Sequence, residues 1–185
     1  MNVRDRIVRT FSYEKTDRVA RYDIFLPEFA DNWRKQKKLP AADLYDYYPD
    51  IDIGVVLADQ GGPLLNKAGE LGERDGYQYI RDGWGRVIKQ RANAYFALEV
   101  SSVLEEKGNL DTLAFDDPTE PARYLELAGQ AETNASRFAP VSGVLGLYMG
   151  SFRMRGQERY LLDMADDPEF CIALAKRLGG VIKVQ

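Results

Sequence analysis

The 185-residue chain contains no histidine, and this absence removes whole classes of chemistry. Without an imidazole there is no histidine base to activate a serine or cysteine nucleophile, and there is no histidine ligand for a metal ion. The single cysteine, Cys171, excludes an internal disulfide and a cysteine-cluster zinc site. Chemistry performed by these residues alone must therefore come from Asp, Glu, Lys, Arg or Tyr side chains, or from backbone groups.

An excess of basic residues and a long hydrophobic run are also missing. Lys and Arg number 25 against 29 Asp and Glu, which gives a formal net charge of −4. Nucleic acids and anionic membrane surfaces attract proteins with a basic excess, so we expect neither as a partner. The most apolar run, residues 141–150, has about half of the roughly 20 residues that a membrane span requires. Residues 1–6 lack the apolar stretch of a secretory signal, and we expect a cytoplasmic protein.

The residues that are present describe a folded α/β protein, with 45% hydrophobic and 29% charged residues. We expect one domain over residues 1–185. Residues 53–58 are apolar on both alternating faces, which is typical of a buried parallel strand, and residues 138–146 form a second candidate. Between and around these strands, apolar spacing and helix-start signals predict helices over residues 2–13, 27–38, 117–137 and 157–164, and from Pro168 onward. This alternation of strands and helices favours the α/β class.

Weaker signals complete the secondary-structure prediction. Residues 77–80 and 86–89 flank Asp82-Gly83, a typical hairpin sequence, and residues 95–100 are a candidate third strand beside them. Residues 17–25 have a mixed composition that leans toward β structure. The pair Gly179-Gly180 is expected to weaken or end the last helix.

Short motifs follow one another along the chain in a familiar order. They are Glu14-Lys15-Thr16-Asp17-Arg18-Val19, Leu26-Pro27-Glu28-Phe29, Pro49-Asp50-Ile51-Asp52, Val141-Ser142-Gly143, Arg155-Gly156-Gln157-Glu158 and Asp167-Pro168-Glu169-Phe170. This series resembles the N-terminal part of the uroporphyrinogen decarboxylase superfamily, which also contains cobalamin-dependent methyltransferases. The resemblance implies a partial TIM-type (β/α)8 barrel: the opening helix, the first three barrel strands, the hairpin excursion and the covering helices.

A complete barrel of this type typically takes about 250 residues and at minimum about 200, more than the chain has. An open parallel sheet would leave an edge strand unpaired. We therefore expect either a fragment that lacks its C-terminal half or a chain that is completed by a partner in an oligomer.

The resemblance also implies a carbon–carbon lyase of porphyrin biosynthesis, which decarboxylates a tetrapyrrole or related polycarboxylate without a metal or organic cofactor. Its substrate would be a small anionic molecule. The family's catalytic aspartate matches Asp59, which directly follows the first apolar strand. Barrel enzymes place catalytic groups after the carboxyl ends of strands, so the residue pattern agrees with this role. The alternative is that Asp59 only caps the turn at Gly61-Gly62.

The substrate-binding arginines of the family match this chain less closely. Two arginines precede the Leu-Pro-Glu-Phe element in the decarboxylases, and here those positions fall on Ala20 and Ile24. Arg21 could serve after a shift of one residue, although in a strand such a shift turns the side chain to the other face.

The family's tyrosine falls on Phe152, which has no hydroxyl group. Tyr148 lies one turn earlier if the segment is helical, and so points in roughly the same direction. Arg153 is a further candidate for contact with an anionic substrate, the alternative being a solvated surface position.

Two other functions remain open beside the decarboxylase. The methyltransferase branch uses a zinc ion held by His and Cys ligands from the later part of the barrel, and none of these ligands is expected within this chain. The third possibility is a non-catalytic fragment or partner subunit, which the absence of His and the displaced arginines would explain.

Overall fold

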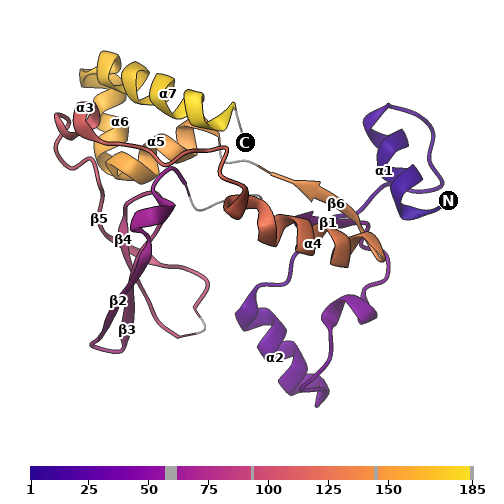
Figure 1. Cartoon of the computed structure of the whole chain (residues 1–185). Coiled ribbons are helices and arrows are strands. Elements are labelled where there is room, and N and C mark those ends of the chain that lie inside the picture. The colour runs from indigo at the N-terminus through magenta and orange to yellow at the C-terminus, as the bar shows by residue number, and fades with distance from the viewer. Residues whose placement is uncertain (57–61, 93, 144–145, 184–185) are drawn as a thin grey trace. The chain divides into compact units, whose positions relative to one another are not determined.

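The computed structural model describes residues 1–56, 62–92, 94–143 and 146–183 (Figure 1). The chain divides into two compact units. The first comprises Met1–Leu57 and Leu125–Gly143, and the second comprises Ala58–Tyr124 and Val144–Gln185. The expectation of one domain over residues 1–185 stays a prediction. Among the described residues, no helix combines the length and the apolar character that crossing a membrane requires.

A parallel pair of strands forms the centre of the first unit. Strand β1 (Ile53–Val56) pairs with β6 (Ala139–Ser142) in a register that runs from Ile53 opposite Ala139 to Val56 opposite Ser142. Helix α4 (Leu125–Ala135) immediately precedes β6 and packs against both strands. A Cβ atom at Gly54 would lie 3.0 Å from Phe138 Cβ, so the absence of a side chain there allows this close approach.

The remaining elements of the first unit come from its N-terminal part. They are α1 (Val3–Phe11), α2 (Pro27–Lys37) and the 3-10 turn η1 (Leu44–Tyr47). The side chain of Asn2 accepts a hydrogen bond from the Asp5 N–H and so begins α1. Pro27 occupies the first turn of α2, where its missing N–H costs nothing, and Lys38 ends that helix in the left-handed conformation. Both helices agree with the sequence prediction.

An antiparallel sheet and three packed helices form the second unit. The sheet contains β2 (Gly69–Arg74), β3 (Tyr77–Arg81), β4 (Val87–Gln90) and β5 (Leu98–Ser101) in chain order. The helices are α5 (Leu147–Arg155), α6 (Gln157–Asp166) and α7 (Pro168–Ile182), and each contacts the other two. The short elements are η2 (Leu65–Lys67), α3 (Asn109–Thr112) and η3 (Pro121–Tyr124).

The core of the second unit is apolar and joins residues distant in sequence. Its buried members are Leu64, Trp84, Leu104, Leu110, Met154, Tyr160, Cys171, Leu174 and Leu178. Gly150 permits α5 to approach Trp84, because a Cβ atom there would lie 2.7 Å from the indole ring. Burial of these side chains is the main stabilising contribution of the unit.

The structure confirms the α/β class and the hairpin at Asp82-Gly83, and it shows the two predicted apolar strands paired in parallel with each other. The prediction of β structure over residues 17–25 is wrong, because this stretch contains no strand. It is held instead by Asp52, whose carboxylate accepts a hydrogen bond from the Arg21 N–H and whose own N–H donates to the Arg21 carbonyl. With a single parallel pair among the described strands, the first three barrel strands and the barrel itself stay a prediction.

Three further differences have local causes. The predicted end of the last helix at Gly179-Gly180 is wrong, since α7 continues to Ile182 with Leu178 and Val181 buried on either side of the glycines. Strand β2 was not expected, and it follows from the turn at Asp75-Gly76, where both residues have positive φ. The helix predicted from residue 117 begins four residues later as η3.

Candidate functional site

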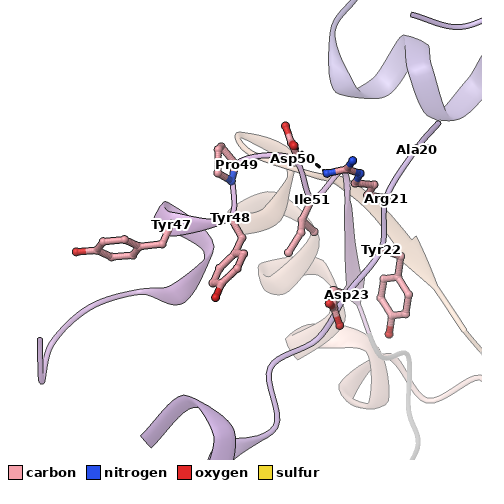
Figure 2. A pocket seen from close by; sticks show the side chains of 9 residues that line it. All are labelled: Ala20, Arg21, Tyr22, Asp23, Tyr47, Tyr48, Pro49, Asp50 and Ile51. Carbon is pink, nitrogen blue, oxygen red and sulfur yellow. Dashed lines mark hydrogen bonds and ion pairs between the residues drawn. The ribbon is translucent and has the colours of Figure 1, made fainter. Parts of the chain in front are cut away.

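A pocket of about 520 Å³ in the first unit contains one of the predicted binding residues, Arg21 (Figure 2). It lies between two segments of the chain, residues 20–23 and residues 47–51, the second of which leads into β1. The lining residues are Ala20, Arg21, Tyr22, Asp23, Tyr47, Tyr48, Pro49, Asp50 and Ile51. A volume of this size falls within the range of roughly 300–1,000 Å³ that small-molecule sites occupy.

A fully buried carboxylate, Asp52, holds the two segments together. It accepts hydrogen bonds from Arg6 Nη1 at 2.6 Å, from Arg18 Nη1 and Nη2 at 2.6 and 2.9 Å, and from the Arg21 N–H at 2.9 Å. Burial alone would raise the pKa of Asp52, but the hydrogen bonds from Arg18, Arg21 and Arg6 outweigh it and lower the pKa below its ordinary value. Asp52 is therefore ionised and fixes the backbone that carries Arg21.

A second carboxylate neutralises the remaining charge of this cluster. Asp17 Oδ1 accepts from Arg6 Nε at 2.8 Å, and Asp17 Oδ2 accepts from Arg6 Nη2 at 2.9 Å. This paired contact lowers the pKa of Asp17 and raises the pKa of Arg6. Because Asp52 lies directly before β1, the cluster marks the amino end of the strand, where barrel folds place residues that stabilise rather than react.

The guanidinium group of Arg21 is already engaged by a carboxylate at the pocket. Its Nη1 lies 2.8 Å from Asp50 Oδ2, and both side chains are 62% exposed. An exposed pair of this kind contributes about 0–1 kcal/mol, because water and salt screen the attraction. A carboxylate from a ligand can therefore replace Asp50 on Arg21 at little cost.

Three of the nine residues that line the pocket are tyrosines. Tyr22, Tyr47 and Tyr48 are 52%, 50% and 39% exposed. In the view of Figure 2, Tyr22 and Tyr48 lie on either side of Asp23, while the Tyr47 ring points away from them. The exposed rings offer apolar contact, and their hydroxyl groups can donate hydrogen bonds to a ligand carboxylate.

The other predicted substrate-binding residues belong to helix α5 of the second unit. Tyr148 and Phe152 lie one turn apart, as expected for a helix, and their ring centroids are 5.6 Å apart. Tyr148 also contacts Tyr160, with centroids 5.9 Å apart. The guanidinium carbon of Arg153 lies 5.9 Å from the centre of the Trp84 ring. The structure thus brings Tyr148 and Phe152 together.

Arg153 differs from a fully solvated surface arginine, which was the alternative to a substrate contact. It is half-buried, and burial lowers its pKa, with the nearby positive charge of Arg86 acting in the same direction. Asp59, the predicted catalytic residue, lies outside the described residues. Its role stays a prediction.

Sequence reasoning missed the function of Asp52 and the tyrosines of the pocket. In the sequence, Asp52 stood out only as the last residue of the Pro49-Asp50-Ile51-Asp52 motif. A carboxylate that is buried at the start of a strand needs a cationic partner. The cluster of Tyr45, Tyr47 and Tyr48 before β1 was a visible signal for an aromatic surface. Within the described parts of the chain, no group of three or more Asp, Glu, Cys or His side chains is arranged to hold a metal ion.

Comparison of the chain with protein-family models, with curated proteins and with solved structures gave no match in any of the three. The resemblance to a known superfamily therefore depends on the quoted motifs alone.

Proposed function

We propose that this chain is part of an enzyme similar to uroporphyrinogen decarboxylase, which removes carboxyl groups from a tetrapyrrole or related polycarboxylate without a cofactor. The observation that carries the proposal is the parallel pair β1–β6 with α4 between the two strands in sequence and packed on both. Strand–helix–strand units of this kind are the repeating element of (β/α)8 barrels. The ordered motifs provide the second, independent support.

The position of Asp59 along the chain fits the chemistry of this reaction. It follows the last residue of β1, Val56, by three positions, the side of a parallel strand on which barrel enzymes carry out catalysis. Decarboxylation of a pyrrole acetate requires a protonated ring that accepts the electron pair left behind when carbon dioxide departs. A carboxylate near the pyrrole N–H groups stabilises the positive charge of that intermediate, which is the role we assign to Asp59.

Arg21 is the proposed contact for a distal carboxylate of the substrate, since it lies with Asp52 at the amino end of β1 whereas Asp59 follows the other end of that strand in the sequence. It is cationic, more than half exposed, and held in the pocket by the backbone bonds between Arg21 and Asp52. Binding would exchange Asp50 for the substrate carboxylate on the same guanidinium group. The net charge of −4 does not by itself oppose this, because exposed charges farther away than a Debye length of about 8–10 Å are largely screened.

Two measurements test the proposal. The first follows loss of carboxyl groups from uroporphyrinogen by chromatography, in the full-length natural protein, for the wild type, Asp59→Asn and the control Asp75→Asn, which changes an exposed turn residue by the same atoms. We expect activity in the wild type and the control and its loss in Asp59→Asn. A wild type without activity, or equal rates in all three proteins, would overturn the proposal.

The second measurement is the binding of uroporphyrin, followed by its own fluorescence. Arg21→Gln should weaken binding by about threefold to tenfold, since it removes a charge-assisted hydrogen bond. Asp50→Asn should tighten binding by about twofold to fivefold, because it removes the competing carboxylate. Arg9→Gln, at an exposed arginine outside the pocket, should leave binding unchanged. Unchanged binding in Arg9→Gln, beside the changes at Arg21 and Asp50, distinguishes a carboxylate site from general electrostatic attraction.

Methyl transfer within the same superfamily is the second candidate, and the residues at the family's arginine positions favour it. Ala20 and Ile24 stand where the decarboxylases carry their two arginines, and Arg153 is packed on the Trp84 ring. The residues of this chain do not fit the zinc ion of that branch, since there is no His and the only Cys, Cys171, is buried with a raised pKa. Any such ligands would have to come from outside these 185 residues, and a zinc measurement on the natural protein decides between the two candidates.

A further inference from the structure

The four-stranded sheet of the second unit has two faces of opposite charge. The register of β2, β3 and β4 places Arg74, Tyr77, Tyr79, Arg81 and Lys89 on one face. Arg91, the residue after β4, joins this face, since its guanidinium carbon lies 5.0 Å from the centre of the Tyr77 ring. We name this group of four cations and two tyrosines the basic face. No acidic residue occupies a strand position on it.

The acidic residues of the same strands lie on the opposite face. The register places Glu70, Glu73 and Glu99 there, together with Gln78 and Ile80. A hydrogen bond of 3.1 Å from Gln78 Nε2 to Glu70 Oε1 agrees with this placement. The separation of charge follows from the alternation of side chains along a strand, because successive residues point to opposite faces.

Aromatic rings rather than carboxylates contact three of the four cations of the basic face, Arg74, Lys89 and Arg91. The guanidinium carbon of Arg74 lies 4.0 Å from the centre of the Tyr79 ring, and Lys89 Nζ lies 5.1 Å from the centre of the Tyr77 ring. None of the four cations forms an ion pair with a carboxylate in the part of the chain that the structure describes. Arg74, Arg81 and Arg91 are exposed. Cation–π contact positions a positive charge without neutralising it, so each cation remains able to bind an anion.

We infer that the basic face binds an acidic protein segment, a run of Asp or Glu side chains in extended conformation. Alternate residues of an extended chain are about 6.6–6.8 Å apart. Lys89 and Arg91 are likewise alternate residues, at the end of β4 and directly after it. Each arginine can hold a carboxylate through two parallel hydrogen bonds. Charge complementarity and matched spacing are therefore the features that identify the partner.

The burial of the Tyr79 ring and the cation contacts on the Tyr77 ring disfavour a single-stranded nucleic acid as the partner. Such ligands gain much of their affinity by stacking bases on open aromatic rings. Tyr79 is only 9% exposed, and the Tyr77 ring is contacted by both Lys89 and Arg91. A symmetric contact between two copies of the chain is also disfavoured, because it would place the basic face against itself.

Fluorescence anisotropy with the full chain tests the inference. The probe is a labelled peptide of alternating Glu and Ser, compared with the same peptide carrying Gln in place of Glu and with oligothymidylate of equal net charge. At about 0.15 M ionic strength we expect only the Glu peptide to bind well. The variant Arg81→Gln/Arg91→Gln should weaken its binding by about tenfold.

A matched control separates this face from the charge of the whole protein. Lys35→Gln/Lys37→Gln removes the same charge from exposed positions on α2 in the other unit, and its affinity for the peptide should stay within about twofold of the wild type. Circular dichroism establishes that both variants fold. Equal loss of affinity in both variants, no binding of the Glu peptide, or tighter binding of oligothymidylate would each overturn the inference.

Discussion

Replacement of Asp52 by asparagine provides the sharpest test of how the first unit is built. The side chain is 0% exposed and accepts four hydrogen bonds, three of them from the guanidinium groups of Arg6 and Arg18. Asparagine has the same shape, but it removes the negative charge and turns an N–H₂ group toward these donors. Loss of one partner from a buried ion pair costs about 3–5 kcal/mol. Because the Arg18 side chain is 31% exposed and can regain water, we expect about 3 kcal/mol, the lower end of that range.

The neighbouring exposed pair supplies the control. Asp50→Asn also removes a carboxylate from an arginine, Arg21, but both of these side chains are 62% exposed. We expect a loss of at most about 1 kcal/mol. Urea unfolding followed by circular dichroism measures both variants, and hydrogen exchange of the β1 amides assigns the loss to the first unit. Equal losses in the two variants would refute the view that burial decides the contribution of these pairs.

The loss of stability caused by Asp52→Asn should depend on pH. The pKa of Asp52 is lowered in the folded protein, so its contribution to stability is present above the unfolded value of about 3.9 and is lost as pH falls through the folded pKa. The difference in unfolding free energy between wild type and Asp52→Asn should therefore be constant from pH 7 to about 5 and shrink at more acid pH. A difference that stays the same down to pH 2 would contradict an ionised Asp52.

Two further predictions concern packing in the second unit, each with a control on the same type of residue. Gly150→Ala should destabilise the protein by about 1–3 kcal/mol, because the new Cβ would lie 2.7 Å from the Trp84 ring. Gly180→Ala, in open space on α7, should stabilise the protein by about 0.5–1 kcal/mol. Stability changes of the same sign in thermal unfolding would count against this packing. Met154→Ala should lower the free energy of unfolding by about 2–5 kcal/mol, because the Met154 side chain is 0% exposed. Met164→Ala, at a side chain that is 47% exposed, should lower it by less than about 1 kcal/mol. Comparable losses for the two variants in urea unfolding would contradict the assigned core.

The helices and the central strand pair could be predicted because their signals are local. Asp167 and Pro168 begin α7, with the Asp167 side chain accepting a hydrogen bond from the Phe170 N–H, and Pro27 begins α2. Apolar residues on both faces of β1 were sufficient to predict a parallel strand, although Ile53 and Val55 are only partly buried. Gly179-Gly180 was misread, because the burial of Leu178 and Val181 against the core outweighs the low helix propensity of glycine.

The candidate site was less predictable, since it depends on contacts between distant residues. Arg21 appeared as a binding candidate through the family motif, but its pairing with Asp50 and its backbone bonds with Asp52 join residues about thirty positions apart. Arg153 was a further candidate for contact with an anionic substrate, which stays a prediction, and its guanidinium group packs on the Trp84 ring. Neither outcome is encoded in spacing along one element.

The sequence alone excluded histidine chemistry and internal disulfides, and it predicted the α/β class and the starts of most helices. Composition and short-range backbone preferences act without regard to the rest of the fold. Tertiary structure alone decided that Asp52 is a buried partner of Arg6 and Arg18, that Arg21 faces a pocket, and that the sheet of the second unit separates its charges. The physical reason is that burial and ion pairing arise only when segments far apart in the chain exclude water from one another.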